Sequence, residues 1–527
     1  MATEMPKIEG VFTRTSSGLV RGVGTRDVFF FGFQTIALSY IVFTVLAWGS
    51  YPGSSMELAS FLAMLGGIAI GACYAMVASV YPRSGAEYVF LSRSLSPSVG
   101  FAFSFSFSFW QMFYIGINGA FLCLFGIAPV LAGIGVQAHN QTMLDWSAWF
   151  SGKWGIFIGG SVAVLLMGYL HYRGAGGYFR WQRGATYVSL VSLAVTIVVL
   201  FLAAIGVLDF KANFNELAGQ GAYAKVVADG VAAGAAPLAT FSLGETWKFV
   251  LWPAFSLWFA ITAVSFSGEV KNVKRGQLGG IVGSVIALGV AFIVLMFLYQ
   301  AAFGSDFMLS AAAVGVPLNA PPFVPFFTAI AGGNVLLTII MSVWVVVIAL
   351  FVLGTAFLYP SRTMLAWSID GMAPDKLADV NERYHSPHWA ILVCVVVAEI
   401  TLALFAFTTL LGVVSGFLGL AVNFLLVCGW CIFFPFLRKS VFESSPIAWR
   451  VAGIPVLTIL GIIAVAFIIP MGYRLLVDKT FSLNLNFVIW GAVIAIVAGF
   501  AWYFGWKTYE RSKGVDIDRR YAEIPIE

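Results

Sequence analysis

The sequence predicts an all-α integral membrane protein with twelve transmembrane helices, on three observations. The chain is 60% hydrophobic and 10% charged, with a mean hydropathy of +0.93. It contains twelve apolar runs of the roughly 20 residues that a helix needs to cross a bilayer, where lipid offers no partner to an unpaired amide. With the N-terminus inside, 23 of the 29 Lys and Arg residues fall on the cytoplasmic side, which is the positive-inside signature.

The predicted spans follow one another with short connections. In chain order they are residues 28–50, 57–80, 98–130, 154–171, 184–208, 249–268, 279–303, 333–358, 388–408, 411–436, 452–474 and 486–508. Residues 1–27 form a cytoplasmic arm, 209–248 an outer loop too short for a core of its own, and 509–527 a cytoplasmic tail. These lengths leave no room for a soluble catalytic domain.

The parity of the spans suggests an internal symmetry. Five spans that begin inside (28–208) precede five that begin outside (249–436). If both halves share one fold, they form an inverted repeat, and residues 437–508 add two more helices.

The bulk composition excludes several classes of protein. The net charge of +5 comes from basic residues scattered over loops, so membrane orientation explains it better than nucleic acid does. The five cysteines all lie within apolar spans, which favours buried small side chains over disulfides or a metal site. No short apolar core with a cleavage site precedes the first span, so that span itself directs insertion into the bilayer.

Two predicted inner loops carry distinct patterns. After span two, in YPRSGAEYVFL, Pro82 ends the helix and Gly85 permits a tight turn. After span six, in SGEVKNVKRG, Glu269 lies at the membrane edge. Physical chemistry alone favours an ordinary charged helix end there.

The loop after span eight, in YPSRTMLAWSIDGMAP, has its own pattern. The polar residues Arg362 and Asp370 alternate with apolar ones in the manner of a short helix lying on the inner surface. Gly371 and Pro374 are expected to end that helix.

Together the three loops resemble the amino acid–polyamine–organocation (APC) family of transporters. The matching residues are Pro82, Gly85 and Tyr88; Glu269, Lys271, Asn272 and Arg275; and Ser361, Arg362, Ala366, Asp370, Gly371 and Pro374. The resemblance spans about residues 25–440. It implies a LeuT-type fold of ten core helices in two inverted halves plus two more, and secondary transport of amino acids or related amines across the cytoplasmic membrane by alternating access, without a cofactor.

The resemblance also places the substrate where spans one and six break near mid-membrane. The usual break glycines correspond here to Leu38-Ser39-Tyr40 and Phe259-Ala260, where β-carbons hinder close approach of a carboxylate to the backbone. The candidate substrate-binding residues are Ala37, Leu38, Ser39, Tyr40, Tyr114, Asn118, Phe255, Ser256, Phe259 and Ala260. Two unbroken helices are the competing interpretation, as is a packing role for Tyr114 and Asn118.

The bulky apolar lining of this site predicts a neutral, hydrophobic or aromatic substrate. Sodium-coupled relatives use hydroxyls on span eight, where Thr355 is the only one in the inner half before the loop, and some proton-coupled relatives use a lysine that span five lacks. Proton coupling is therefore favoured over sodium, and exchange without an ion stays open. Glu399 is the only charge deep in a span, and a proton-carrying role is one interpretation of it. A neutral or hydrogen-bonded structural glutamate is favoured, because the ninth helix is peripheral to the site in the family.

Other functions fit the sequence less well than transport does. A membrane enzyme is disfavoured because the sequence has no HExxH motif, no pair of intramembrane aspartates and no histidine near the middle of a span. A phosphate-binding loop of the GxxxxGK(S/T) type is also missing, which argues against primary active transport by this chain alone. A transporter-like nutrient sensor that binds without coupled transport remains the alternative.

Overall fold

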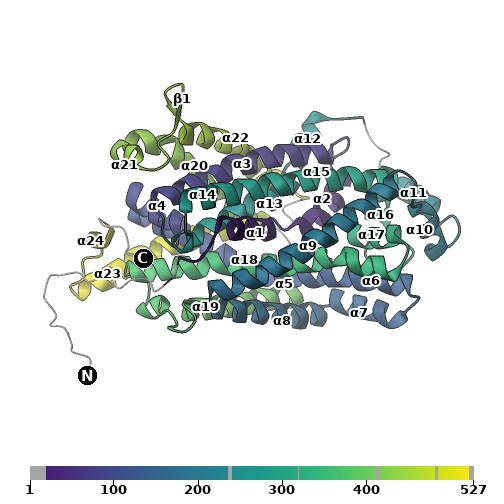
Figure 1. Ribbon diagram of the computed structural model, residues 1–527, viewed down its shortest axis with the longest axis horizontal. Helices are drawn as coiled ribbons and strands as arrows, with labels where there is room; N and C mark the ends of the chain where they lie inside the picture. Colours follow the sequence, from purple (N-terminus) through teal and green to yellow (C-terminus); the bar gives the residue numbers. More distant parts are fainter. Residues whose placement is uncertain are drawn as a thin grey trace.

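A computed structural model describes residues 19, 21–235, 240–318, 320–409, 416–480 and 485–521. Residues 411–415 of the predicted tenth span, 236–239 of the outer loop and parts of both predicted terminal segments lie outside the described residues. The described chain forms an elongated helical bundle (Figure 1).

Twelve helical segments of the described chain are long and apolar enough to cross a membrane, which confirms the predicted fold class. They are Thr25–Ser50, Met56–Val80, Pro97–Gln137, Lys153–Tyr172, Ala175–Ala204, Leu243–Glu269, Val273–Phe303, Val335–Ile369, His388–Phe407, Phe417–Leu437, Val456–Val477 and Val488–Ser512. The predicted spans match these segments one for one.

Four of the spans are built from shorter elements. Span one comprises α1 (Thr25–Thr35), the 3₁₀ segment η1 (Leu38–Tyr40), α2 (Ile41–Ala47) and the 3₁₀ segment η2 (Trp48–Ser50), and span three comprises α5 (Pro97–Phe121), the π-helical η3 (Leu122–Ile127) and α6 (Ala128–Gln137). Span six comprises α12 (Leu243–Phe249), α13 (Leu251–Leu257) and the 3₁₀ segment η4 (Trp258–Glu269). Span seven comprises α14 (Val273–Gln277), the π-helical η5 (Leu278–Val282) and α15 (Gly283–Phe303).

The remaining spans are single helices; short elements connect the spans, and the last of the short elements, α24, follows the twelfth span. The spans are α3 (Met56–Val80), α8 (Lys153–Tyr172), α9 (Ala175–Ala204), α18 (Val335–Ile369), α19 (His388–Phe407), α20 (Phe417–Leu437), α22 (Val456–Val477) and α23 (Leu485–Ser512). The connecting elements are α4 (Ala86–Ser94), α7 (Gln141–Ser151), α10 (Phe210–Ala218), α11 (Ala222–Ala232), α16 (Ser305–Val314), α17 (Val324–Gly332), the 3₁₀ segment η6 (Asp375–Ala378), α21 (Lys439–Ser444), the antiparallel pair β1 (Arg450–Val451) and β2 (Ile454–Pro455), and α24 (Asp518–Tyr521).

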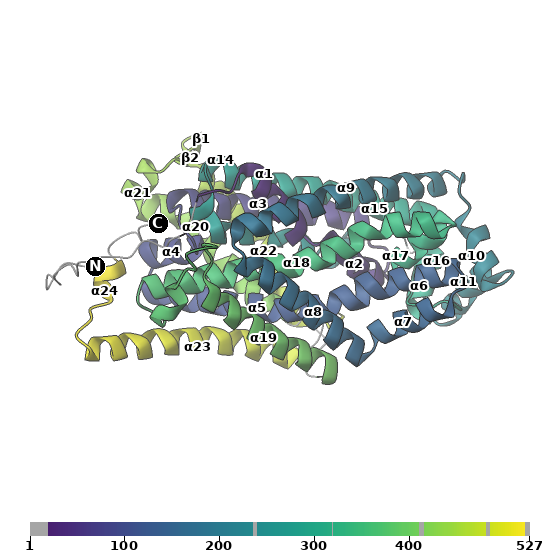
Figure 2. The same ribbon diagram turned by 60° about the horizontal axis from the view of Figure 1, so that its bottom comes forward.

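The two ends of the bundle carry different elements (Figure 1, Figure 2). Helices α4, α21 and α24 gather at one end, and α10, α11 and α16 at the other. We call the first the basic end; it comprises residues 21–24, 81–96, 265–278, 361–387, 438–455 and 513–521. At the opposite end the predicted outer loop packs onto the bundle, since the Phe210 ring lies 4.7 Å from that of Phe303.

Spans one and six form the centre of the bundle. Of the most apolar 18 residues in each, 94% are buried, compared with 33% in the ninth span and 28% in the twelfth. A helix that is apolar all round belongs in the interior, whereas one with a lipid-facing side remains partly exposed in the protein alone. The candidate residues on spans one and six therefore lie in the core.

Span one breaks where the sequence predicts. Helix α1 ends at Thr35, Ala37 adopts a left-handed conformation (φ 51°, ψ 64°), and α2 begins at Ile41. For a residue with a β-carbon, this conformation costs roughly 1–2 kcal/mol relative to a right-handed helix. No glycine or proline lies between Gly32 and Gly49, so tertiary packing holds the break open.

Span six is not interrupted at Phe259-Ala260, where a break is predicted. Helix α13 changes at Trp258 into a 3₁₀ helix of 12 residues, and the backbone leaves helical geometry only at Phe266 (φ −108°, ψ 27°). Such helices rarely exceed three or four residues, and long ones often mark a hinge or a strained sequence. The predicted parting at Phe259-Ala260 is therefore wrong, and a tightened helix passes the break in span one.

Candidate substrate site and the contacts at the basic end

A small cavity lies beside the break in span one. It is lined by Thr35, Tyr40, Gln111, Tyr114, Asn118, Phe255, Phe259, Thr262, Val352, Thr355 and Ala356. All of these residues except Phe259 are buried. The cavity volume is about 30 Å³, which is room for about two water molecules.

The polar residues of the cavity wall carry no formal charge. Tyr40 Oη donates a hydrogen bond to Asn118 Oδ1. The Thr355 hydroxyl donates to the Val352 carbonyl at 2.8 Å, within its own helix. Gln111 Nε2 is buried and has no hydrogen-bond partner among the described residues. The amide of Gln111 is thus a donor at the cavity that the protein itself leaves available.

Aromatic rings form one side of the cavity. The rings of Tyr40 and Phe255 stack with centroids 5.7 Å apart. Phe259 meets Phe255 edge to face at 6.0 Å, and Phe417 of α20 lies behind both, 5.2 Å from Phe255. Rings of this kind suit an apolar side chain and can reorient to enlarge the space.

Five of the ten predicted site residues line this cavity, and five do not. Those in the wall are Tyr40, Tyr114, Asn118, Phe255 and Phe259; those packed away from it are Ala37, Leu38, Ser39, Ser256 and Ala260, all buried. Ala37 makes the bend itself. The hydroxyl oxygens of Ser39 and Ser256 are buried without a partner among the described residues, so the break leaves polar atoms unsatisfied around it.

The sequence-based prediction of the site left out six wall residues: Thr35, Gln111, Thr262, Val352, Thr355 and Ala356. Gln111 and Thr355 carried a signal, since both are polar residues in long apolar spans. Val352 and Ala356 carried none, because nothing in an apolar helix distinguishes the face turned toward a cavity.

Arg362 and Glu269 form a buried ion pair near the basic end. Arg362 Nε lies 2.9 Å from Glu269 Oε1, and the two side chains are 0% and 2% exposed. The predicted surface helix around Arg362 is wrong, because α18 continues unbroken through Pro360 to Ile369. The expectation of an ordinary charged helix end at Glu269 is also wrong, because its side chain is buried in an ion pair. Removing Arg362 would leave this carboxylate buried without a counter-charge.

Backbone contacts also join spans one and six at this end. The Val23 amide donates to the Glu269 carbonyl at 3.0 Å, and the Lys271 amide donates to the Val23 carbonyl at 3.0 Å. Gly85, in a left-handed conformation (φ 69°), donates its amide to the Ser265 carbonyl at 2.8 Å. The start of α1, the end of η4 and the turn before α4 are therefore fixed to one another.

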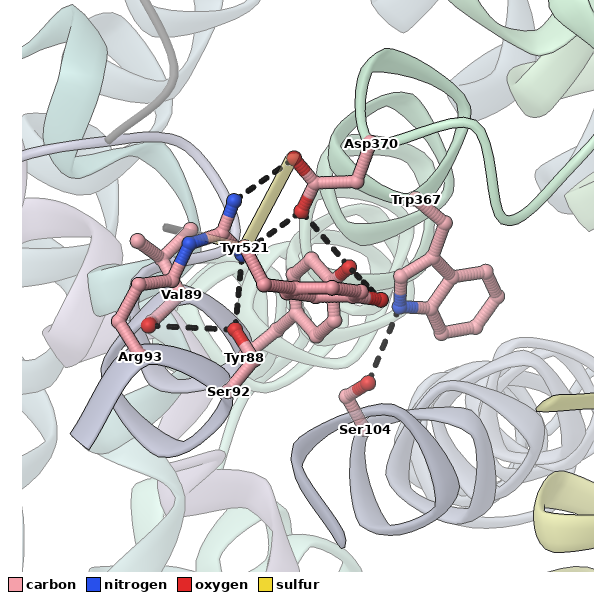
Figure 3. A network of polar contacts seen from close by, with 8 residues as sticks. All are labelled: Tyr88, Val89, Ser92, Arg93, Ser104, Trp367, Asp370 and Tyr521. Carbon is pink, nitrogen blue, oxygen red and sulfur yellow. Dashed lines mark hydrogen bonds and ion pairs between the residues drawn. The ribbon is translucent and has the colours of Figure 1, made fainter. Parts of the chain in front are cut away.

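Asp370 is the centre of a second polar network (Figure 3). Arg93 holds it with two hydrogen bonds of 2.7 Å, and Tyr88 Oη donates to it at 2.8 Å. The hydroxyl of Tyr521, from α24, lies 3.0 Å from that of Tyr88. The loop after span two, the loop after span eight and the C-terminal tail thus meet in one cluster.

Comparison with known protein families agrees with this arrangement. The family model described as amino acid permease matches residues 23–504. The match runs from the start of span one into the last span, and it includes all three inner-loop motifs and every residue of the cavity wall. The chain therefore belongs to the amino acid permease family, a family of multi-pass membrane transporters for amino acids.

Proposed function

We propose that this permease is a secondary transporter that moves neutral, hydrophobic or aromatic amino acids across the cytoplasmic membrane by alternating access. One observation carries the proposal. The cavity beside the break in span one is lined by aromatic, aliphatic and uncharged polar residues. A cationic or anionic side chain would lose its hydration there without gaining a counter-charge.

The polar groups suit the common part of an amino acid. The α-helical hydrogen bonding of span one is interrupted between Thr35 and Ile41, and main-chain groups freed at such a break are suited to a carboxylate or an ammonium. Gln111 adds a donor without a protein partner. The stacked rings of Tyr40 and Phe255 would receive the substrate side chain.

The present cavity of about 30 Å³ is too small for a side chain such as that of phenylalanine. Binding therefore requires the aromatic wall to move. Phe259 is the wall residue that retains partial exposure, and its rotation away from Phe255 would enlarge the space.

Alternating access would open the basic end, which we place in the cytoplasm together with both chain termini. The contacts that must separate are Val23 with Lys271 and Arg362 with Glu269. The moving parts would be two inverted halves, residues 28–208 and 249–436, with 437–508 appended. We take the coupling ion to be a proton rather than sodium.

The test uses purified protein in liposomes with imposed proton or sodium gradients. We expect leucine or phenylalanine to accumulate, with arginine and glutamate transported poorly. Preference for a charged amino acid would contradict the neutral-substrate proposal. Binding without uptake under every gradient would favour the nutrient sensor.

A further inference from the structure

Glu87 is a buried carboxyl group outside the cavity wall. It lies in the first turn of α4 and is 1% exposed. Its Oε1 atom accepts a hydrogen bond from Tyr359 Oη of α18. Its Oε2 atom is buried and has no hydrogen-bond partner among the described residues.

Other buried carboxylates in the described chain have a cation beside them. Asp27 pairs with Arg183, Glu269 with Arg362, Asp370 with Arg93 and Asp478 with Arg474. No such ion pair forms at Glu87 within the described ranges, although Arg93 lies on the same helix. That guanidinium is held by both oxygens of Asp370 instead.

The two positive groups near Glu87 are both paired with other carboxylates. From the helices packed against α4 and from Tyr359's helix α18, the titratable groups are Cys73 and Tyr74 of α3, Tyr114 of α5, Glu269 of η4, Arg362 of α18 with Tyr359, and Cys428 and Cys431 of α20; α4 itself adds Tyr88 and Arg93. The two arginines are held by the carboxylates Asp370 and Glu269. Burial without a counter-charge raises the pKa of Glu87 to about 7, against the opposing effects of Tyr359 and Tyr74.

Glu87 is a residue of the basic end that one layer of side chains separates from the cavity. Tyr359, which binds it, is one helical turn beyond the cavity residue Thr355 on α18. The ring of Phe107 packs on Tyr359 at 4.4 Å and lies one turn before the cavity residue Gln111 on α5.

The same carboxyl group is connected to the contacts that hold the basic end closed. The next residue, Tyr88, binds Asp370. Two residues before Glu87, the Gly85 amide donates to Ser265 of η4. A change of charge at Glu87 therefore acts on the same short helix whose ends contact spans six and eight.

We propose that Glu87 is the residue that takes up and releases the co-transported proton. This inference rests on the proposed function. A proton from water on one side adds to the carboxylate and gives a neutral carboxylic acid, and loss of that proton to the other side restores the carboxylate. With a zwitterionic amino acid, one positive charge then crosses the membrane with each substrate molecule.

The test compares Glu87→Gln with wild type and with Glu399→Gln in liposomes. Glu399 is the matched control, because it is another carboxyl without an ion pair among the described residues, and it is bound only by Ser161 at 2.6 Å on α8. Two assays are run: leucine accumulation driven by a pH gradient, and exchange of labelled for unlabelled leucine at equal pH. We expect Glu87→Gln to lose accumulation and keep exchange, and Glu399→Gln to keep both.

Several outcomes would overturn the inference. Leucine accumulation by Glu87→Gln would overturn it. Wild-type uptake that a pH gradient does not drive would also overturn it, although amino acid transport itself would still stand. Loss of both assays in a folded Glu87→Gln protein would also overturn it. If that variant does not fold, Glu87→Asp decides: the inference requires accumulation with a shifted pH profile, and an unshifted profile contradicts it. Absence of all amino acid transport by the wild type would instead refute the proposed function.

Discussion

The cavity and the basic end use opposite kinds of interaction, although both join spans one, six and eight. The cavity wall holds stacked rings, an unpaired Gln111 amide and no charge. The basic end is held by two buried ion pairs with directional hydrogen bonds, Arg362–Glu269 and Arg93–Asp370. Ring contacts tolerate rearrangement, whereas a buried ion pair is costly to separate without a replacement partner. We infer that the proposed substrate site adapts while the basic end holds one of a few discrete arrangements.

The largest effect is expected when one charge of the basic end is removed. Arg362→Ala leaves Glu269 buried without its partner and should cost about 3–5 kcal/mol of stability. Thermal unfolding in detergent measures this loss. The matched control is Arg450→Ala, whose partner Glu443 is exposed; it should cost no more than about 1 kcal/mol. Similar losses in the two variants would contradict the view that the buried Arg362–Glu269 pair supports the basic end more than an exposed pair does.

Glu87 belongs to the basic end, on α4, and its contribution to stability should depend on pH. The folded protein binds the proton more tightly than the unfolded chain, since the pKa of Glu87 rises from 4.5 to about 7. Its stabilising contribution is therefore complete below pH 4.5 and is lost as the pH rises toward 7. Glu87→Gln removes this dependence.

The variant should accordingly match wild type at pH 4.5 and exceed its stability by up to about 3 kcal/mol at pH 8. Thermal unfolding curves at the two pH values check the sign. A Glu87→Gln protein that is equally destabilised at both would indicate that the carboxylate, not the acid, is the form the fold prefers.

A substitution in the cavity wall should change substrate binding more than it changes the stability of the protein. Gln111→Leu removes a donor that has no protein partner, so folding should be unaffected. Loss of a hydrogen bond to substrate should weaken its binding by about 1–3 kcal/mol, seen as a raised KM for leucine uptake. Thr355→Val is the comparison within the same wall: its hydroxyl already donates to the Val352 carbonyl, so we expect a smaller rise in KM than for Gln111→Leu. An unchanged KM in Gln111→Leu would remove this residue from the substrate site.

The sequence predicted the central helices better than the surfaces between them. The twelve spans follow from apolar runs of sufficient length, and the break in span one from the match to a family pattern. Whether residues such as Thr355 and Val352 face the cavity depends on how their helix is rotated about its axis. A nearly uniform apolar pattern does not specify that rotation.

The basic end was misjudged for a different reason. Charged residues in short loops normally lie on the surface, so the sequence places Arg362 and Glu269 there. They are 93 residues apart in the chain, and only the packing of η4 against α18 brings them together. A buried charge can be recognised only once its partner is known.

The smallest expected effect concerns the C-terminal tail. Tyr521→Phe removes one hydroxyl contact with Tyr88 and keeps the ring over Arg93, whose guanidinium carbon lies 4.9 Å from the ring centroid. The cost in thermal unfolding should be about 0.5–1.5 kcal/mol. Tyr88→Phe should cost more, since it also loses the hydrogen bond to Asp370. If Tyr521→Phe destabilised the protein as much as Arg362→Ala, the tail would have to count as a principal support of the basic end. A small loss would instead mean that Arg93 and Asp370 hold that end closed with the tail as a secondary contact.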